Sequence, residues 1–418
     1  MLLQLDKRAV ATQKKAIKLF ITGSKSETNR LLVLQALYPE LTIENESNSD
    51  DSDVMTKAIL QVRNNPNSLQ LLDIHHAGTA MRFLTAYFAT QIDTEVILTG
   101  SSRMKERPVE ILVNALRTLG AKIEYLENEG FPPLKITGTE LEKNSILLPA
   151  NVSSQYISAL LLIAPKLKNG LILILDGEIT SRPYIEMTLA LLNEIGVEAK
   201  FDGNKIIVNT LQQINAKKIT VESDWSSASY WYSVVALSNV GTKIVLSSYK
   251  INSRQGDAIL SEIYEQFGVF TTFNSDGNIT ISKEKTLEIA SFSYDLINAP
   301  DIAQTIVVTC FGLKISCHLT GLHTLKIKET DRLLAIQNEI TKLGGYINTN
   351  ENSLFLEKDT KINTNCAIAT YQDHRMAMAF APLALLVPIK IENANVVSKS
   401  YPNFWNDFKE VACLEEIK

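Results

Sequence analysis

The sequence has little of what a metal cluster, a disulfide framework or a membrane segment requires. Its four cysteines, Cys310, Cys317, Cys366 and Cys413, are widely scattered and form no C-x-x-C pair, which argues against a zinc site and favours a reducing compartment. The longest apolar run, Met376 to Ile389, is too short to span a bilayer. These shortages argue against a disulfide-stabilised secreted protein and against a membrane-spanning one.

The chain also lacks an excess of positive charge. Its net charge is −5 and its pI is near 5.7, which argues against a protein that coats nucleic acid or an anionic membrane. The segment Met1 to Phe20 has no uninterrupted apolar stretch of the kind that a secretory signal needs. We therefore expect a cytoplasmic protein without nucleic-acid or membrane partners, in which any cationic site is local.

What the sequence does contain is a recurring helix start. Six times a polar segment runs directly into small and apolar residues typical of a buried helix, and after the first step the starts recur every 72 to 75 residues. They lie near Ser26, Thr79, Ser154, Ser226, Asp301 and His374. Such a recurrence indicates a repeated folding unit. Because helix N-termini offer unpaired N–H groups and a positive dipole end, several of them together predict a polyanionic ligand.

A second element recurs at a similar spacing. Four amphipathic segments end in a hydrophobic residue followed by glycine, at Gly120, Gly196, Gly268 and Gly344. Hairpins are predicted after the first three, over 121–125 with 134–137, 197–201 with 205–208, and 269–273 with 278–281. One unit is then a buried helix, a strand, an amphipathic helix and a hairpin, a split β-α-β pattern built about six times with degraded first and last copies. Six units exceed one core, so two lobes are expected.

Several helix starts carry candidate anion ligands. The segment Gly23 to Arg30 lacks the glycine spacing of a nucleotide P-loop, but Lys25 and Arg30 could hold a phosphate or carboxylate, with a solvated turn as an equal alternative. Gly78 permits close backbone approach to a ligand, or only relieves a turn. Arg103 to Pro108 places three cations before a helix N-terminus, where the dipole disfavours them, which favours an anion clamp over a solvated charge run.

Other polar residues admit both a structural and a functional interpretation. Serine at a helix start is first of all a good N-cap, which applies to Ser153, Ser154 and Ser181. Lys328 and Arg332 stand one helical turn apart around a carboxylate, an arrangement that a surface helix face also explains. Asp373-His374-Arg375 opens a nearly all-apolar helix and so borders on buried surroundings, which favours function. Asp301 could be an N-cap or a general base.

Taken in order along the chain, these segments resemble one family, 5-enolpyruvylshikimate-3-phosphate synthase, also called 3-phosphoshikimate 1-carboxyvinyltransferase. The resemblance runs nearly end to end. Its motifs are GSKSxxNR at Gly23 to Arg30, AGTAMR at Ala77 to Arg82, RMKERP at Arg103 to Pro108, SSQ at Ser153 to Gln155, KETDR at Lys328 to Arg332 and DHRMAM at Asp373 to Met378. The segments Asp224 to Tyr230 and Lys399 to Pro402 extend it.

The resemblance implies an α/β (α+β) fold of two lobes, each built of three split β-α-β (βαβαββ) units, with a six-fold internal repeat and an inside-out α/β barrel form. One lobe would comprise residues 21–223 and carry most shikimate 3-phosphate contacts. The other would comprise residues 1–20 plus 224–418 and carry Asp301, Glu329, His374, Arg375 and Lys399. We expect a monomeric transferase of the shikimate pathway, active in aromatic amino-acid biosynthesis and a glyphosate target.

By the same resemblance, the lobes together would hold two substrates. Shikimate 3-phosphate would contact Lys25, Ser26, Arg30, Ser153, Ser154, Gln155, Ser181, Asp301, Thr324 and Lys328. Phosphoenolpyruvate would contact Lys25, Gly78, Arg103, Gln155, Arg332, Arg375 and Lys399. Each substrate carries a phosphate and a carboxylate, which gives a physical reason for so many cations on an acidic protein.

The implied reaction needs no metal and no organic cofactor. The 5-hydroxyl of shikimate 3-phosphate would attack C2 of phosphoenolpyruvate, with Asp301 as proton acceptor and Glu329 as proton donor to the methylene carbon. The resulting tetrahedral intermediate would then lose phosphate. Lys25, His374 and Lys399 would assist proton traffic and stabilise leaving-group charge.

Some positions depart from the family pattern, and two rival functions remain. Thr324 stands where many members have Asn or Arg, and His76 and Phe83 flank Gly78, the position that controls glyphosate access. The first rival is a UDP-N-acetylglucosamine enolpyruvyl transferase, which usually has a cysteine in the loop corresponding to Arg103 to Pro108, where this chain has none. The second is a non-catalytic two-lobed anion-binding protein, which would not need Asp301.

Overall fold

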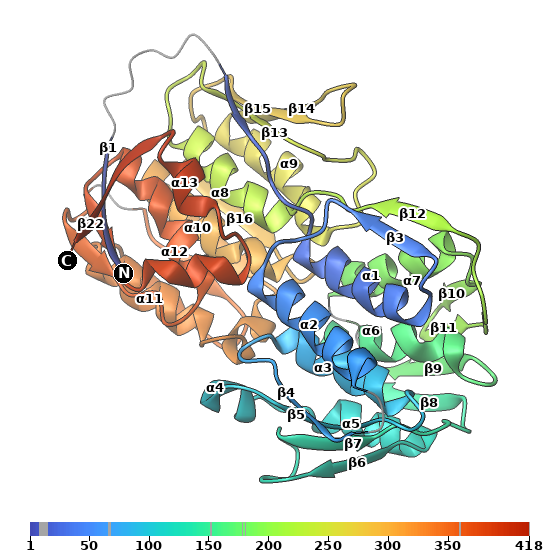
Figure 1. Ribbon diagram of the computed structural model, residues 1–418. Coiled ribbons are helices and arrows are strands. Elements are labelled where there is room, and N and C mark those ends of the chain that lie inside the picture. The colour runs from blue at the N-terminus through green and yellow to red at the C-terminus, as the bar shows by residue number, and fades with distance from the viewer. Residues whose placement is uncertain are drawn as a thin grey trace. The chain divides into compact units, whose positions relative to one another are not determined.

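The computed structural model describes residues 1–7, 16–65, 68–150, 153–177, 179, 181–358 and 361–417 (Figure 1). The middle of the N-terminal segment considered above, residues 8–15, lies outside this set. The chain divides into two compact units, which we call unit 1 (Met1–Thr22 with Glu222–Lys418) and unit 2 (Gly23–Val221). Both mix helices and strands, so the fold is α/β.

Unit 2 packs its longer helices against one another and against three sheets. The helices are α1 (Lys25–Leu37), α2 (Asp50–Asn64), α3 (Gly78–Ala89), α4 (Ser102–Lys105), α5 (Glu110–Leu119), α6 (Ser154–Ile163), α7 (Arg182–Glu194) and the 3₁₀ turn η1 (Ala164–Lys166). The strands are β3 (Leu41–Glu44), β4 (Gln70–Asp73), β5 (Glu95–Thr99), β6 (Lys122–Tyr125), β7 (Leu134–Thr137), β8 (Ser145–Pro149), β9 (Leu171–Asp176), β10 (Ala199–Asp202), β11 (Lys205–Val208) and β12 (Lys217–Thr220).

Unit 1 combines the chain's beginning with its second half. Its helices are α8 (Trp225–Ala236), α9 (Leu260–Ile263), α10 (Ala303–Leu313), α11 (Arg332–Lys342), α12 (His374–Phe380) and α13 (Phe404–Phe408), with 3₁₀ turns η2 (Gly256–Ile259), η3 (Tyr264–Phe267), η4 (Pro300–Ile302), η5 (His323–Ile327), η6 (Ala381–Leu385) and η7 (Ala394–Lys399). Its strands are β1 (Leu2–Lys7), β2 (Ile17–Leu19), β13 (Lys243–Leu246), β14 (Val269–Phe273), β15 (Ile279–Lys283), β16 (Ser291–Asp295), β17 (Ser316–Thr320), β18 (Ile347–Thr349), β19 (Leu354–Leu356), β20 (Cys366–Ile368), β21 (Ile389–Ile391) and β22 (Ala412–Ile417).

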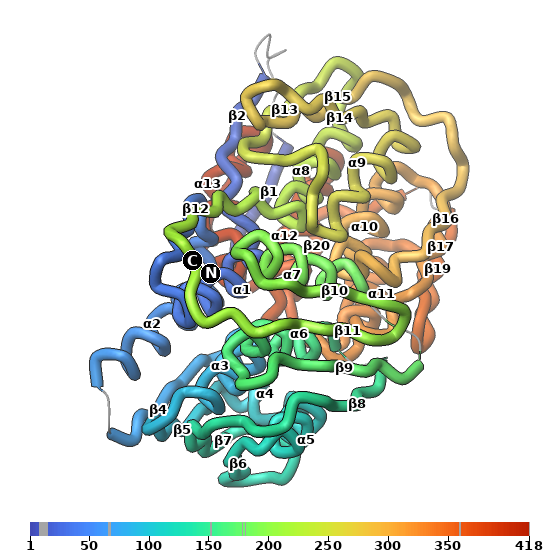
Figure 2. Tube along the Cα trace, turned by 90° about the vertical axis from the view of Figure 1, so that its right-hand side faces the viewer, coloured from blue at the N-terminus to red at the C-terminus, as the bar shows by residue number. Residues whose placement is uncertain are grey.

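Five of the six sheets formed by the described residues share one strand pattern. Each begins with a parallel pair and adds two antiparallel strands, as in β4-β5-β7-β6, whose strands lie side by side in Figure 2. The others are β8-β9-β11-β10, β2-β13-β15-β14, β16-β17-β19-β18 and β20-β21-β1-β22. The sixth contains only β3 and β12, paired in parallel. The predicted hairpins are the last two strands of three of these sheets, so their prediction is confirmed.

Each unit has its own core, and its buried helices form the centre of that core. In unit 1, α8, α10 and α12 pack on one another (Figure 1), and in unit 2, α3 packs against α1 and α6. These helices are buried almost all round, as the sequence predicted. The charged residues of α3 and α12 lie within the first five residues of each helix, so these helix starts carry the charge.

The helix ends also follow the prediction, with one exception. Gly120, after α5, has φ of 118° and ends the helix in the left-handed conformation that glycine tolerates best. The amphipathic helix predicted to end at Phe267 is instead broken into η2, α9 and η3. Gly256 is a weak helix former, which disfavours a regular helix start here. Asp257, the next residue, is buried instead of facing solvent. Among the described residues, no helix has both the length and the apolar character needed to cross a bilayer.

Candidate functional site

Arg332 is the centre of a charged cluster in unit 1. Its Nε lies 2.7 Å from Asp373 Oδ2, its Nη1 2.8 Å from Asp301 Oδ1 and its Nη2 2.8 Å from Glu329 Oε2. Its side chain is only 2% exposed. Burial disfavours the charged guanidinium, but Asp373, Glu329 and Asp301 outweigh that effect and raise the pKa of Arg332. The guanidinium therefore stays charged and fixes three carboxylates around itself.

Local sequence explains why these groups meet. Asp373 is the N-cap of α12 and accepts from the Arg375 N–H at 2.8 Å, while Asp331 caps α11 and leaves Arg332 as the first helical residue. Asp301 lies in η4, directly before α10. Three helix starts thus contribute to one cluster; α10 and α12 continue as buried apolar helices, whereas α11 is amphipathic.

Asp301 is surrounded by cations on both carboxylate oxygens. Besides Arg332, its Oδ1 lies 3.4 Å from Lys328 Nζ, and its Oδ2 lies 3.3 Å from Arg375 Nη2. Burial alone would raise the pKa of Asp301, but Lys328, Arg375 and Arg332 together hold it well below its usual range. Asp301 is therefore an ionised acceptor, and its basicity depends on whether these three cations also bind other anions.

The remaining predicted residues of unit 1 border this cluster. Lys399, at the end of η7, lies 3.2 Å from Glu329 Oε1, so Glu329 bridges two cations. His374 is buried, with Nδ1 3.7 Å from Asp373 Oδ1. Thr324 in η5 has a buried hydroxyl without a hydrogen-bond partner among the residues that the structure describes. We refer to Asp301, Lys328, Glu329, Arg332, Asp373, Arg375 and Lys399 as the Arg332 cluster.

In unit 2, two of the predicted cations, Lys25 and Arg30, lie in α1. Lys25 Nζ lies 3.5 Å from Asp51 Oδ2 near the start of α2. Ser24, rather than Ser26, caps α1 by accepting from the Glu27 N–H at 3.4 Å. The Ser26 side chain is consequently not needed as a cap, and Lys25 is held by a single carboxylate.

Arg30, a predicted phosphate ligand, uses most of its donors inside unit 2. It donates to Thr188 Oγ1 at 2.7 Å, to Ser158 Oγ at 3.0 Å, and to the carbonyl oxygens of Ser26 and Tyr184 at 2.7 and 3.2 Å. Burial lowers the pKa of Arg30 to about 10, which still leaves it charged at neutral pH. Arg30 thus ties α1 to α6 and α7 as well as presenting a positive charge.

The arginine that lies beside Gly78 is Arg107. A Cβ added to Gly78 would stand 2.5 Å from Arg107 Nη1, so the guanidinium fills the space where a side chain would be. Arg103 is exposed and pairs with Glu106 at 2.9 Å. The short helix α4 explains the difference, because it turns Met104 into the core and Arg103 outwards.

Two residues fix the chain just beyond Arg107. Arg82, in α3, donates from Nη2 to the Pro108 carbonyl at 2.9 Å, and the Tyr156 hydroxyl donates to the same oxygen at 2.6 Å. The Arg82 guanidinium also lies over the Tyr156 ring. Sequence reasoning named Arg82 only as part of a motif, and this contact could not have been deduced from its spacing.

The predicted serines divide into caps and non-caps. Ser153 caps α6 by accepting from the Gln155 N–H at 3.3 Å, and the Gln155 amide in turn donates to Thr79 Oγ1 at 3.3 Å. Ser181 precedes α7 with φ of 52° and makes no capping bond through its side chain. A serine in the left-handed region is strained, which is more common at functional positions than elsewhere. The described residues contain no group of three His, Cys, Asp or Glu that could hold a metal ion.

Each unit therefore presents cations at the starts of buried helices, an arrangement suited to small, multiply charged anions. Solved structures with the same fold include the EPSP synthase of Acinetobacter baumannii, with a TM-score of 0.78 and 23% identity over 99% of this chain and all of that one. The enolpyruvyl transferase NikO of Streptomyces tendae has a TM-score of 0.71 at 12% identity, covering 99% and 98%. At these identities the similarity shows the fold alone.

Sequence comparison is more specific. The chain belongs to the EPSP synthase (3-phosphoshikimate 1-carboxyvinyltransferase) family, which it matches over residues 10–408. A 3-phosphoshikimate 1-carboxyvinyltransferase of Bacteroides fragilis strain YCH46 is 46% identical over 394 residues, 93% of this chain and 94% of the relative. That of Shewanella halifaxensis is 34% identical over 416 residues, 94% and 96%. The resemblance recognised from the motifs is confirmed.

Proposed function

We propose that this protein transfers the enolpyruvyl group of phosphoenolpyruvate to the 5-hydroxyl of shikimate 3-phosphate and releases phosphate. Membership of the EPSP synthase family supports this reaction. The structural observation that carries it is that one buried guanidinium, Arg332, touches both carboxylates proposed for proton transfer, Asp301 and Glu329. An anion-binding protein without catalysis would not need two such carboxylates beside its cations.

The proposed substrate contacts follow the family motifs. For shikimate 3-phosphate they are Lys25, Ser26, Arg30, Ser153, Ser154, Gln155, Ser181, Asp301, Thr324 and Lys328. For phosphoenolpyruvate they are Lys25, Gly78, Arg103, Gln155, Arg332, Arg375 and Lys399. We add Arg107 to this set, because its guanidinium lies against Gly78. The buried hydroxyl of Thr324 has no hydrogen-bond partner among the described residues, which supports its inclusion, since a ligand oxygen could bond to it.

The mechanism has two halves, an addition and an elimination, and each half needs proton transfers. As the 5-hydroxyl oxygen bonds to C2 of phosphoenolpyruvate, its proton passes to Asp301 and Glu329 gives a proton to the methylene carbon. In the second half, Glu329 recovers a proton from the new methyl group while the C–O bond to phosphate breaks, and the proton that Asp301 took from the hydroxyl passes to the departing phosphate, which restores both carboxylates. Lys25 and Lys399 would stabilise the departing phosphate, with His374 assisting proton transfer.

The ion pairs of Asp301 suggest how this carboxylate becomes a base. With three cations around it, its pKa is too low for efficient proton uptake. All three of these cations, Lys328, Arg332 and Arg375, are proposed substrate ligands. When substrate carboxylate and phosphate groups take over part of that positive charge, the pKa of Asp301 rises. Substrate binding would therefore activate its own base.

We further propose that the fold is a six-fold repeat of split β-α-β units, three in each lobe, forming inside-out α/β barrels. The shared strand order of five sheets supports this. We also propose lobe limits of 21–223 and 1–20 plus 224–418, a monomeric state, and a cytoplasmic location in aromatic amino-acid biosynthesis.

The test is to follow phosphate release from phosphoenolpyruvate with either shikimate 3-phosphate or UDP-N-acetylglucosamine as acceptor. We expect release only with shikimate 3-phosphate, and formation of the enol ether product by NMR. Release with the amino-sugar nucleotide alone would establish the rival transferase instead. Binding of shikimate 3-phosphate without any release would establish a non-catalytic binder.

A further inference from the structure

Asp257 is a buried carboxylate that neither the motifs nor the proposed mechanism uses. It lies in η2 of unit 1 and is 3% exposed. Its Oδ2 accepts a short hydrogen bond from the Ser226 hydroxyl, whereas its Oδ1 has no hydrogen-bond partner in the described part of the chain. Aspartate is rarely buried unless it is paired, because desolvation disfavours its charge. Its position therefore needs an explanation.

The Ser226 hydroxyl connects Asp257 to Arg375. Ser226 is the second residue of α8, and its Oγ accepts from Arg375 Nη2 at 3.2 Å. The same Nη2 lies 3.3 Å from Asp301 Oδ2. A hydroxyl has one proton, so a serine that donates to Asp257 must offer its lone pairs to the arginine. Asp257 thereby fixes Ser226 as an acceptor.

We propose that Asp257 is a positioning residue that acts through Ser226 to hold Arg375 in the orientation that binds phosphoenolpyruvate. This inference rests on the proposed function. Arg375 has two partners on one nitrogen, and Asp301 is the one that a substrate carboxylate can replace. Ser226, held by Asp257, remains in place during that exchange and keeps the guanidinium aligned. Alignment matters because bidentate recognition of a carboxylate by arginine depends on geometry.

The electrostatics make this arrangement dependent on pH. Burial, followed by repulsion from Asp301, raises the pKa of Asp257 to about 6, although Arg375 and the Ser226 hydrogen bond oppose the shift and Asp224 adds to it. Above about pH 6 the carboxylate is charged and accepts the serine proton. As pH falls below that value, the carboxyl acquires its own proton and the constraint on Ser226 weakens.

The raised pKa of Asp257 affects stability in the opposite sense to binding: the charged form aligns Arg375 but destabilises the fold. Because the folded pKa lies above the unfolded one, Asp257 stabilises the fold when protonated, and that contribution is lost as pH rises through about 6. At pH 7.5 the charged carboxylate is thus a cost to the fold. Asp257→Asn should leave the melting temperature unchanged or raise it, while weakening phosphoenolpyruvate binding.

The experiment compares Asp257→Asn, Ser226→Ala and the double variant with the wild-type protein. At pH 7.5 we expect each single change to raise KM for phosphoenolpyruvate by at least about fivefold, in line with hydrogen bonds to charged groups. KM for shikimate 3-phosphate should stay within twofold. The double variant should resemble the single ones, because both changes break one connection. Additive effects would overturn the proposal.

The pH profile supplies a second readout. Phosphate groups themselves titrate near pH 6, so the informative quantity is the ratio of the KM values of Asp257→Asn and wild type. We expect this ratio to approach one as pH falls from 7.5 to 5.5, because wild-type Asp257 then becomes neutral as well. A ratio that is constant over this range would contradict the proposal.

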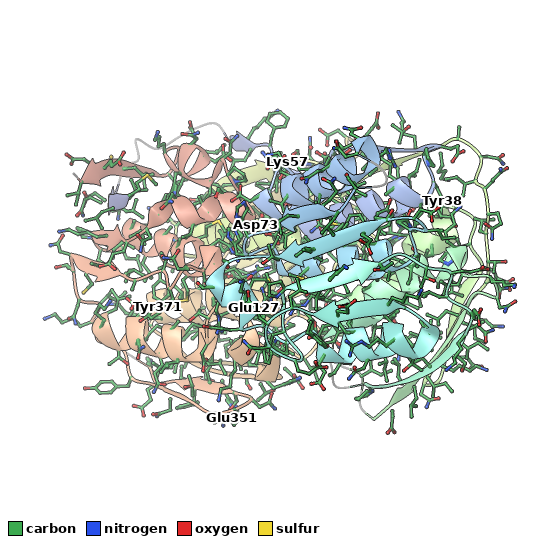
Figure 3. The ribbon with its side chains drawn as sticks, turned by 60° about the horizontal axis from the view of Figure 1, so that its bottom comes forward. Tyr38, Lys57, Asp73, Glu127, Glu351 and Tyr371 are labelled. Carbon is green, nitrogen blue, oxygen red and sulfur yellow. The ribbon has the colours of Figure 1, made fainter. Side chains whose placement is uncertain are left out.

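Glu339→Gln is the matched control. Glu339 is also a buried carboxylate of unit 1, 1% exposed, but it bonds to Lys342 and to the hydroxyl of Tyr371, which is labelled in Figure 3. This variant should melt at a lower temperature with KM for phosphoenolpyruvate unchanged. If wild type turns over and Asp257→Asn keeps the wild-type KM, or raises both KM values equally, this inference alone fails. Lack of turnover by wild type would overturn the proposed function and this inference with it.

Discussion

Replacing Arg332 by methionine measures how much of the stability of unit 1 depends on one guanidinium. Each of its three nitrogen atoms faces a different carboxylate at 2.7 to 2.8 Å. Methionine keeps most of the side-chain volume and removes the charge. The change therefore isolates the electrostatic role of Arg332 from its packing role.

The expected loss follows from what each carboxylate retains. Removing one partner of a buried ion pair costs about 3–5 kcal/mol. Asp301 keeps Lys328 and Arg375, and Glu329 keeps Lys399. Asp373 is fully buried, and the partners it keeps among the described residues are a backbone N–H and His374. We therefore expect a loss of about 4 kcal/mol, which in a unit of about 150–250 residues lowers Tm by about 8–16 °C.

Scanning calorimetry at pH 7.5 and pH 5 gives the answer. The difference between variant and wild type should shrink at pH 5, because carboxylates deprived of their cation have raised pKa values and protonate more readily. Lys326→Met is the control, since Lys326 pairs with the exposed Glu351, labelled in Figure 3, and exposed pairs contribute little to stability. An Arg332→Met protein that melts within 2 °C of wild type would refute the reasoning.

Three further changes test other contacts. Arg30→Lys should lower the free energy of unfolding by about 2–3 kcal/mol in urea titrations, because a lysine cannot reproduce the bonds to Thr188 and its neighbours; an unchanged midpoint would contradict this. Gly78→Ala introduces a Cβ 2.5 Å from the Arg107 guanidinium, so KM for phosphoenolpyruvate should rise about tenfold with little change in Tm, and unchanged steady-state kinetics would refute the role of Arg107. Asp301→Asn should bind shikimate 3-phosphate in calorimetric titrations but turn over at least about a hundredfold more slowly; undiminished turnover would remove Asp301 as the base.

The fold was predictable where short-range rules decide the backbone. The starts of α3, α6 and α12 lie within two residues of the predicted positions, because glycine or a capping residue precedes an apolar run in each. The hairpin turns at Gly130 and Gly203 were predictable for the same reason, since glycine adopts their positive φ values without strain.

The site was predictable in its residue types but not in its contacts. Arg103 and Arg107 both belong to the motif before Pro108, and the motif does not show which of them meets Gly78; α4 buries Met104 and turns Arg103 outwards, which leaves Arg107 beside Gly78. Asp257 gave no signal, because its partner Ser226 is 31 residues away along the chain. Arg30 was predicted as a ligand, yet four bonds within unit 2 give it an equal structural role, which no linear pattern reveals.

The position of β1 affects the order in which the protein can be made. This strand lies between β21 and β22, with Leu2 opposite Ile417, so it pairs with strands that are synthesised long after it. Figure 1 shows β1 beside β22. Until β21 and β22 have been synthesised, β1 has neither neighbour and its backbone must stay hydrated or be shielded. The continuous stretch Gly23–Val221 meets no such delay. Nascent chains should therefore acquire protease resistance first in that stretch, with the flanking unit following only once β21 and β22 are available to β1.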